Sequence, residues 1–168
     1  MKTIKLTRGQ VALVDDADFE LLNQYKWSLA IGSNAGYSFY AKTRIKNKTV
    51  YMHRMILNPT DKQTVDHDNG NGLDNRRSNI RLCNSSQNQA NRGRQKNCNS
   101  GFKGVSWHKE QRKWVAWIQF SKKHIYLGRF DNKIGAAVAY DNAAIKYHGE
   151  FARTNFNGAL NKDDAIAV

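Results

Sequence analysis

"VDHDNGNGLDNRRSNIRLCNSSQNQANR", residues 65–92, decides how the first half of the chain is interpreted. Its start, taken with the preceding threonine as "TVDHDNG", predicts a short strand that enters a glycine-rich loop, and "SNIRLC" predicts a second strand. "NSSQNQANR" predicts a helix capped by Asn84, Ser85 or Ser86, because asparagine and serine side chains cap helix N-termini. The expected order is therefore strand, loop, strand, helix.

The polar side chains of this stretch have the chemistry that phosphodiester hydrolysis needs. A neutral histidine with a pKa of ~6.5 can take a proton from water, and a hard divalent cation can be bound by carboxylate and amide oxygens. Asp66 and His67 can supply the carboxylate and the base if they converge at a strand end, and Asn79 is a candidate to orient the imidazole. Three asparagines share one face of the predicted helix and are candidates for a second metal ligand: Asn84, Asn88 and Asn91. Spacing does not choose among them, and a lone Asp-His pair is also common as a structural feature.

The charge of the chain predicts a polyanionic partner. The formal net charge is +13, and it is uneven: residues 1–74 hold 10 basic and 8 acidic side chains, whereas residues 75–168 hold 17 and 6. No acid occurs between Asp74 and Glu110. A solvated surface usually mixes both signs, so this stretch predicts nucleic-acid contact. The basic candidates in and after the opening stretch are Arg76, Arg77, Arg81, Arg92, Arg94 and Lys96.

The last third of the chain predicts a sheet and a helix. "GFKGVSWHKEQRKWVAWIQFSKKHIYLGRFD" contains three alternating runs, 104–108, 113–120 and 124–130, separated by polar turns, which is typical of an antiparallel meander. "NKIGAAVAYDNAAIKYHG" predicts an alanine-rich helix that ends at Gly149. One strand face, with Trp114, Ala116, Ile118 and Phe120, should cover the helix. The other face should be exposed and should bind DNA in the major groove through Ser106, His108, Trp117, Gln119, His124, Tyr126 and Arg129.

These patterns predict an α+β protein of two domains. Residues 1–92 form a β-rich unit, residues 93–100 a polar linker, and residues 101–158 a three-stranded antiparallel sheet packed on one helix. The chain has no apolar run of the ~20 residues that span a bilayer and no signal-peptide pattern, so we expect a cytoplasmic protein without a membrane partner. Two cysteines are too few for a disulfide framework or a four-thiolate zinc site.

The first half resembles the HNH endonucleases of the ββα-metal fold, most closely the phage branch that includes homing endonucleases. The likeness covers roughly residues 5–95, and its motif elements are "MHRMILN" (52–58), "VDH" (65–67), "NG" (69–70), "LDNRRSNIR" (73–81) and "NQANR" (88–92).

This resemblance implies roles for particular residues. His67 matches the general base, Asn79 the asparagine that orients it, and Asp66 and Asn88 the ligands of one divalent cation, Mg²⁺ or Mn²⁺. Many members of the family carry histidine at the position of Asn88. His53, in a matching His-Arg element, has either a supporting or phosphate-contact role or a buried structural one. The resemblance implies 5′-phosphate and 3′-hydroxyl products and a phage origin with action in the bacterial host; no structural zinc is expected, because CxxC pairs are absent.

The second half resembles the Apetala-two/ethylene-response-factor DNA-binding domain over residues 101–157. The matching text is "GFKGVSW", "KWVAWI", "YLGRFD", "AAVAYDNAAIKYHG" and "FARTNF". Plant relatives carry several arginines on the face that contacts bases, whereas this chain has other residues at much of it, so the base preference of the family is not transferred.

Together the two resemblances predict a metal-dependent DNA endonuclease of the homing type. It would nick or cleave double-stranded DNA as a monomer, guided by its C-terminal module. The main rival is a non-catalytic, sequence-specific DNA-binding regulator. A weaker rival is an RNA-binding protein in which Trp117 and Tyr126 stack on bases.

Overall fold

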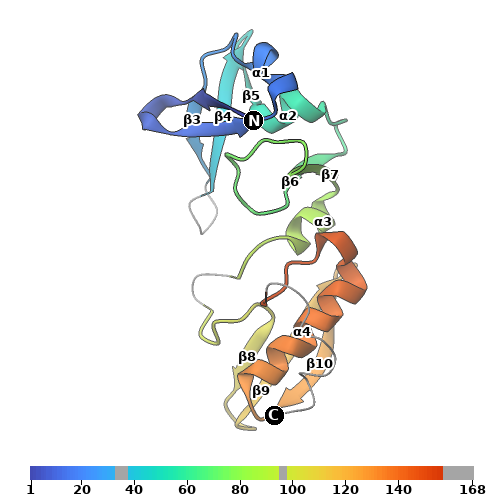
Figure 1. Ribbon diagram of the computed structural model, residues 1–168. Coiled ribbons are helices and arrows are strands. Elements are labelled where there is room, and N and C mark those ends of the chain that lie inside the picture. The colour runs from blue at the N-terminus through green and yellow to red at the C-terminus, as the bar shows by residue number, and fades with distance from the viewer. Residues whose placement is uncertain (33–37, 95–97, 157–168) are drawn as a thin grey trace. The chain divides into compact units, whose positions relative to one another are not determined.

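The computed structural model describes residues 1–32, 38–94 and 98–156 (Figure 1). The chain divides into two compact units, Met1–Asn88 and Gln89–Val168. Both are mixed α/β structures with antiparallel sheets, which confirms the predicted α+β class at this level. No helix among the described residues has the length and apolar character needed to span a bilayer.

The first unit begins with two small antiparallel sheets. Its elements up to residue 57 are β1 (Lys2–Lys5), β2 (Val11–Val14), α1 (Asp16–Leu22), β3 (Ser28–Ile31), β4 (Phe39–Ile45), β5 (Lys48–Tyr51) and α2 (Met52–Leu57), with a 3-10 turn at Thr7–Gly9. Strands β1 and β2 pair with each other, and β3, β4 and β5 form a sheet in that order. Lys46 and Asn47 form the turn between β4 and β5 with positive φ angles of 46° and 64°, which suits the twist of a two-residue hairpin turn.

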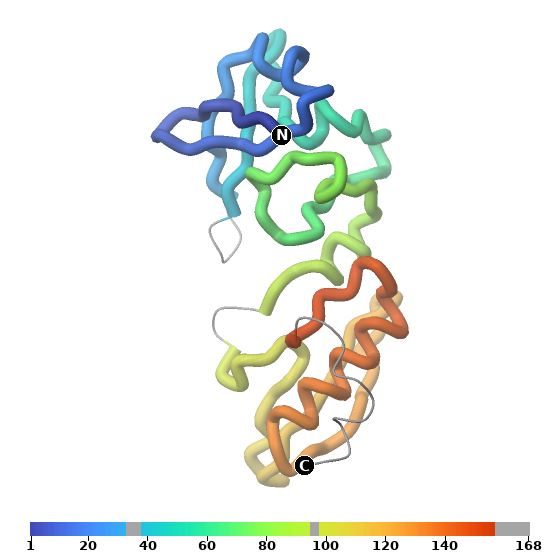
Figure 2. The backbone as a smooth tube through the Cα atoms, in the orientation of Figure 1, coloured from blue at the N-terminus to red at the C-terminus, as the bar shows by residue number. Residues whose placement is uncertain are grey.

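The segment from Thr64 to Ala90 folds in the predicted order. Strand β6 (Thr64–His67) pairs antiparallel with β7 (Ile80–Cys83), and α3 (Ser85–Ala90) follows. Residues 68–79 form a wide loop between the two strands (Figure 2). Asn84 caps α3, because its side-chain oxygen accepts a hydrogen bond from Gln87 N at 2.9 Å while Gln87 Oε1 accepts one from Asn84 N at 2.8 Å. This reciprocal cap selects Asn84 from the three predicted candidates.

The core of the first unit forms between its sheets and helices. Trp27 is 3% exposed, and its indole N–H donates to the Leu22 carbonyl at 2.7 Å. The other buried members of this core come from β1, β2, α1, β4, α2 and β7 and from Leu6: Ile4, Leu6, Ala12, Val14, Leu22, Ala41, Met52, Ile56 and Ile80. Strand β7 thus contributes to the same core as the N-terminal hairpin, which fixes the wide loop at the edge of the unit.

The second unit is the predicted meander and helix. Strands β8 (Val105–His108), β9 (Lys113–Phe120) and β10 (Lys123–Phe130) form an antiparallel sheet with β9 in the middle, and α4 (Lys133–His148) lies along it (Figure 1). Asn132 caps the helix by accepting a hydrogen bond from Gly135 N at 2.6 Å. Four buried alanines, Ala136, Ala137, Ala143 and Ala144, bring α4 close to the sheet.

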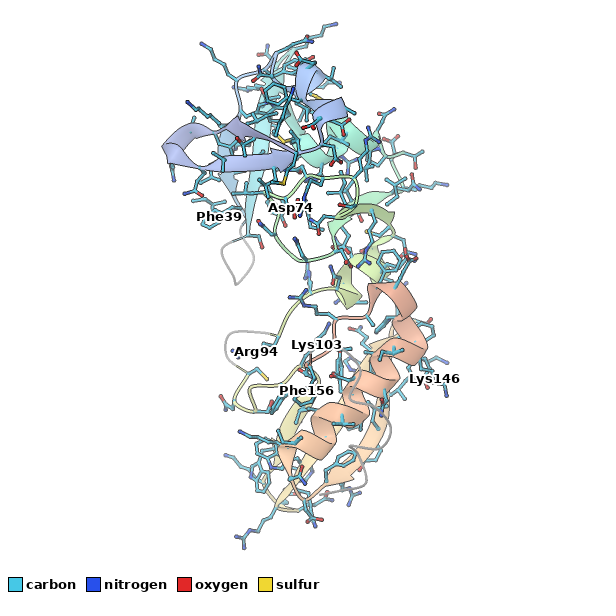
Figure 3. All side chains as sticks on the ribbon, in the orientation of Figure 1. Phe39, Asp74, Arg94, Lys103, Lys146 and Phe156 are labelled. Atoms are coloured by element: carbon cyan, nitrogen blue, oxygen red, sulfur yellow. The ribbon has the colours of Figure 1, made fainter. Side chains whose placement is uncertain are left out.

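Residues on both sides of the meander are tied to it. The Asp141 carboxylate of α4 accepts hydrogen bonds from Asn155 N at 2.8 Å, Asn155 Nδ2 at 3.0 Å and Phe156 N at 3.0 Å. The Asn155 side chain in turn accepts a hydrogen bond from Lys103 N at 2.6 Å. Lys103 and Phe156 are labelled in Figure 3. Ser100 is 4% exposed and donates to the Val105 carbonyl at 2.8 Å. The end of the predicted linker is therefore packed against the module.

Candidate nucleic-acid interface

The outer face of the β8–β10 sheet carries the residues predicted to contact DNA. Cross-strand pairing places Trp117 opposite Tyr126 and Gln119 opposite His124, and it places Val115 between Ser106 and Arg129. Side chains alternate along a strand, and a β-bulge between Tyr126 and Gly128 shifts β10 by one residue, so that Arg129 returns to the side of Tyr126. These residues therefore share the face that α4 does not cover. Ala116 and Ile118, between them in sequence, are 0% and 2% exposed and belong to the core on the helix side.

Two aromatic rings and one arginine form the centre of this face. Trp117 is 42% exposed, Tyr126 is 44% exposed, and their ring centroids lie 4.9 Å apart. The Nε–H of Arg129 donates to the Tyr126 hydroxyl oxygen at 2.9 Å. Tyrosine and tryptophan are enriched at interfaces, and exposed apolar groups that cluster are typical of surfaces that contact a partner. The hydroxyl restricts the guanidinium to the neighbourhood of the two rings.

The edges of the same face are polar. Ser106, Gln119 and His124 are exposed, and His108 is half-buried at the end of β8. The Nδ1 atom of His108 accepts a hydrogen bond from Gln111 N at 3.4 Å, so this imidazole also helps to hold the β8–β9 turn. The face therefore combines hydrogen-bonding groups with an apolar, aromatic centre.

The predicted basic contacts divide into two groups. Arg92 and Arg94 are exposed, and Lys96 lies outside the described residues. Three arginines of the first unit are instead paired with acids: Arg76 with Asp74, Arg77 with Asp18, and Arg81 with Asp66 and Asp68. Arg77 and Asp18 make two hydrogen bonds of 2.8 Å across 59 residues of sequence, a contact that local sequence patterns do not show.

His67 lies in a buried polar cluster, but its observed partner differs from the predicted one. Its Nε2 atom is 3.3 Å from Asn75 Oδ1. The Asn79 side chain, predicted to orient the imidazole, instead accepts from Asn69 N at 3.1 Å and donates to the Asp74 carbonyl at 2.8 Å. Asn79 thus shapes the wide loop. The reason lies in β2, where Leu13 O accepts from Asn75 N at 2.8 Å and holds Asn75 inside the unit.

The residues predicted to bind a divalent cation do not fit one. Asp66 and Arg81 are cross-strand partners, and Asp66 Oδ2 accepts from Arg81 Nε at 3.1 Å and Nη2 at 2.9 Å. Arg81 also reaches Asp68 Oδ1 at 2.6 Å. A cation at Asp66 would have to displace this largely buried guanidinium. Asn88 is half-buried on α3, and within the described ranges no three His, Cys, Asp or Glu side chains gather as a metal site.

The two histidines of this cluster are packed against tyrosines. The rings of His53 and His67 lie 5.1 Å apart, and His53 stacks on Tyr51 at 5.5 Å. Burial, reinforced by the neighbouring His67, lowers the pKa of His53 to about 3, and burial also lowers the pKa of His67. His53 Nδ1 is buried without a hydrogen-bond partner among the described residues. This placement matches the structural role that the sequence left open for His53.

This cluster makes the stability of the first unit dependent on pH. Unfolded histidines bind protons below pH ~6.5, whereas folded His53 binds one only near pH 3, so stability falls as the pH drops below ~6.5. At pH 5, we expect His53 alone to cost about 2 kcal/mol of unfolding free energy relative to pH 7.5. Urea unfolding at the two pH values measures this.

A matched variant isolates the contribution of His53. His53→Phe keeps a planar ring against Tyr51 and cannot be protonated, so its loss of stability between pH 7.5 and pH 5 should be about 2 kcal/mol smaller. Burial also lowers the pKa of His148, so the wild type has other sources of pH-dependent stability. The test is therefore the difference in pH dependence between the wild type and His53→Phe. An exposed control, His124→Ala, should keep the full dependence. Equal pH dependence in the wild type and His53→Phe would contradict a neutral, buried His53.

Comparisons with known proteins match the second unit. Residues 100–150 match the family model described as "AP2 domain". "APETALA2-like protein 2" of Oryza sativa subsp. indica is 48% identical over 69 residues, which cover 40% of this chain and 16% of that protein. "Ethylene-responsive transcription factor WRI1" of Arabidopsis thaliana is 43% identical over 60 residues, which cover 34% of this chain and 14% of that protein. The chain thus spans about a sixth or less of the length of these relatives.

These comparisons correct the predicted activity. The matched family model is the AP2 domain, and the relatives include proteins named as transcription factors, so the prediction of a metal-dependent HNH endonuclease is wrong. The strand, strand, helix order around residues 64–90 is present, but nothing supports a ββα-metal motif there. The roles assigned to His67, Asn79, Asp66 and Asn88 depended on that activity and fall with it. The relatives named above are plant proteins and do not support a phage origin, which stays a prediction.

The resemblance proposed for the second half is confirmed. The match at residues 100–150 covers the three strands of the sheet and α4, the elements that position Trp117, Tyr126 and Arg129. The C-terminal module is therefore similar in sequence to the AP2 domain.

Proposed function

We propose that this chain is a sequence-specific DNA-binding regulator, and that the outer face of the β8–β10 sheet contacts double-stranded DNA. The observation that carries the proposal is the exposed pair Trp117–Tyr126 with Arg129 hydrogen-bonded to its hydroxyl. The likeness of this module to domains of plant transcription factors supports it.

The chemistry of this face suits the major groove. A β-ribbon fits into a groove about 12 Å wide, and its outward side chains then reach base edges. Arginine pairs with guanine, glutamine with adenine, and apolar groups contact the thymine methyl. The outer face offers one group of each kind: an arginine in Arg129, a glutamine in Gln119, and apolar rings in the Trp117–Tyr126 pair. The expected target is therefore a mixed site with a guanine next to A·T pairs.

We further propose how the chain is organised for this task. A single copy binds through the domain at 101–158, joined by residues 93–100 to the domain at 1–92. Arg92 and Arg94, both exposed, can add contacts to phosphates, which position the protein without specifying sequence.

Selection from a random duplex library tests the proposed function. We expect the full chain to enrich a short motif, and we expect this duplex to bind more tightly than a scrambled duplex of the same composition. Single-stranded RNA of equal length should compete poorly. Failure to enrich any motif, or stronger competition by single-stranded RNA, would contradict a regulator that recognises duplex DNA.

A further inference from the structure

The first unit uses most of its acids internally. Residues 1–88 hold 13 basic and 8 acidic side chains. Six of the eight acids form ion pairs with the N-terminal amine, Lys2 or an arginine of the β6–β7 region: Asp16, Asp18, Glu20, Asp66, Asp68 and Asp74. The three arginines of this unit that were predicted to contact DNA, Arg76, Arg77 and Arg81, are thus neutralised. The net positive charge of the unit must lie elsewhere.

Much of this charge lies on the hairpin of β4 and β5. We call Lys42, Arg44, Lys46 and Lys48 the basic hairpin. Ala41 and Thr43 are 0% and 8% exposed on the core side of β4, so alternation places Lys42 and Arg44 on the opposite face. Arg44, Lys46 and Lys48 are exposed, and among the described residues none of the four cations takes part in an ion pair.

The face that carries Lys42 and Arg44 also includes two tyrosines, whose rings pack against His53. Lys42 pairs across the strands with Tyr51, and Arg44 pairs with Thr49. Tyr40 lies on the same side, with its ring 6.2 Å from that of Tyr51. Both tyrosines are half-buried. Lysine, arginine, tyrosine and threonine side chains all make hydrogen bonds to phosphate oxygens in protein–DNA complexes.

We infer that the basic hairpin is a second DNA-contact surface, which binds the phosphate backbone of a duplex without recognising its sequence. This inference rests on the proposed function, because it takes duplex DNA as the ligand of the basic hairpin. Charge complementarity selects this ligand, because the four cations are not neutralised by the acids of their own unit. The surface lacks the exposed aromatic centre of the β8–β10 face, so it contributes affinity rather than specificity.

A triple variant of the full chain tests this surface. Arg44→Gln, Lys46→Asn and Lys48→Gln remove three exposed charges, and asparagine tolerates the positive φ at residue 46. We expect the affinity for the enriched duplex and for a scrambled duplex to fall by a similar factor, about 10-fold near 100 mM salt. The slope of log affinity against log salt should decrease in magnitude by about 2 to 3.

A second triple variant controls for net charge. Lys5→Gln, Arg8→Asn and Lys62→Gln remove the same number of exposed charges from the first unit, and Arg8 also has a positive φ. This variant should lose at most about 3-fold in affinity. Equal losses in the two triple variants would reduce the effect to overall charge and overturn the inference. If folding of the hairpin variant is impaired, Arg44→Gln alone should still lower both affinities by about 2-fold.

The same titrations separate this inference from the proposed function. If Arg129→Ala abolishes the preference for the enriched duplex while the hairpin variant binds like its control, the regulator stands and the second surface is rejected. If no duplex is preferred by the wild type, the proposed function itself fails. If the hairpin triple variant loses the ability to bind anionic lipid vesicles but binds the duplexes as well as the wild type does, the hairpin has a different partner, and the inference is again overturned.

Discussion

Replacing Gly104 with alanine is expected to destabilise the C-terminal module strongly and to weaken its DNA binding. Gly104 has a φ of +75°, and an added Cβ would collide with the Tyr140 ring and lie 2.7 Å from the Trp117 carbonyl oxygen. Tyr140 is 4% exposed in the core between the sheet and α4, so it has no room to move away. Backbone strain and overpacking each cost about 1–3 kcal/mol, and together they should exceed about 3 kcal/mol.

Gly101 provides the matched control for this substitution. Its φ is +80°, yet a Cβ there would meet nothing within 4 Å, so Gly101→Ala isolates the backbone strain. Urea unfolding of the full chain, followed by tryptophan fluorescence, measures both variants, because three of the four tryptophans lie in the module. Gly101→Ala should lose about 1–2 kcal/mol and keep its DNA binding. A Gly104→Ala protein as stable as Gly101→Ala would contradict the close packing of Tyr140.

The sequence predicted the local structure of this protein well because that structure follows from short-range patterns. The period-two alternation of residues 113–120 assigned Ala116 and Ile118 to the helix side and Trp117 and Gln119 to the outer face, as the structure has them. The order of elements from residue 64 to 90 was also predicted. Turn residues, helix caps and alternation act over a few residues, and the sequence displays them directly.

The polar interior of the first unit was not predictable in the same way. Asn75 and Asn79 lie in one loop and have the same chemistry, but Asn75 is held by a hydrogen bond from its N–H to the carbonyl of Leu13, 62 residues earlier, and its side chain faces His67. The pairing of Arg77 with Asp18 depends on a similar long-range contact. The short motif Asp66-His67 therefore predicted a catalytic site, whereas in the structure these residues belong to a network of hydrogen bonds that holds the unit together.

The basic hairpin was overlooked for a related reason. Its cations are spread over residues 42–48, where the sequence around them is not unusual in composition, whereas the arginines of residues 76–81 begin a stretch with no acid between Asp74 and Glu110. In the structure Arg76 pairs with the nearby Asp74, Arg77 and Arg81 reach acids farther along the chain, and the hairpin cations form no such pairs among the described residues. A count of charges along the chain cannot show which of them are already paired.

Replacing Arg129 with alanine should weaken binding to the enriched duplex by about 10- to 100-fold, with a much smaller effect on a scrambled duplex. A bidentate contact from arginine to guanine contributes about 1–3 kcal/mol of discrimination, or about 5- to 150-fold, which includes this range. The Tyr126 hydroxyl accepts a hydrogen bond from Arg129 Nε at 2.9 Å, and this leaves the terminal guanidinium nitrogens available to a base. Fluorescence anisotropy with both duplexes, at one fixed salt concentration, measures affinity and discrimination together.

Tyr126→Phe separates the positioning of Arg129 from the packing of the aromatic pair. Phenylalanine keeps a ring against Trp117 but removes the hydroxyl that holds the guanidinium, so we expect about a 3-fold loss of affinity for the enriched duplex. When Tyr126→Phe is combined with Arg129→Ala, it should cause no further loss of affinity, because without Arg129 the hydroxyl has no guanidinium to position. Lys146→Ala, which removes an exposed cation from α4, is the control for charge alone and should leave discrimination unchanged. If Arg129→Ala lowers binding to the enriched and scrambled duplexes equally, Arg129 contacts phosphate, and the specificity of this face must come from Gln119 and the aromatic pair instead.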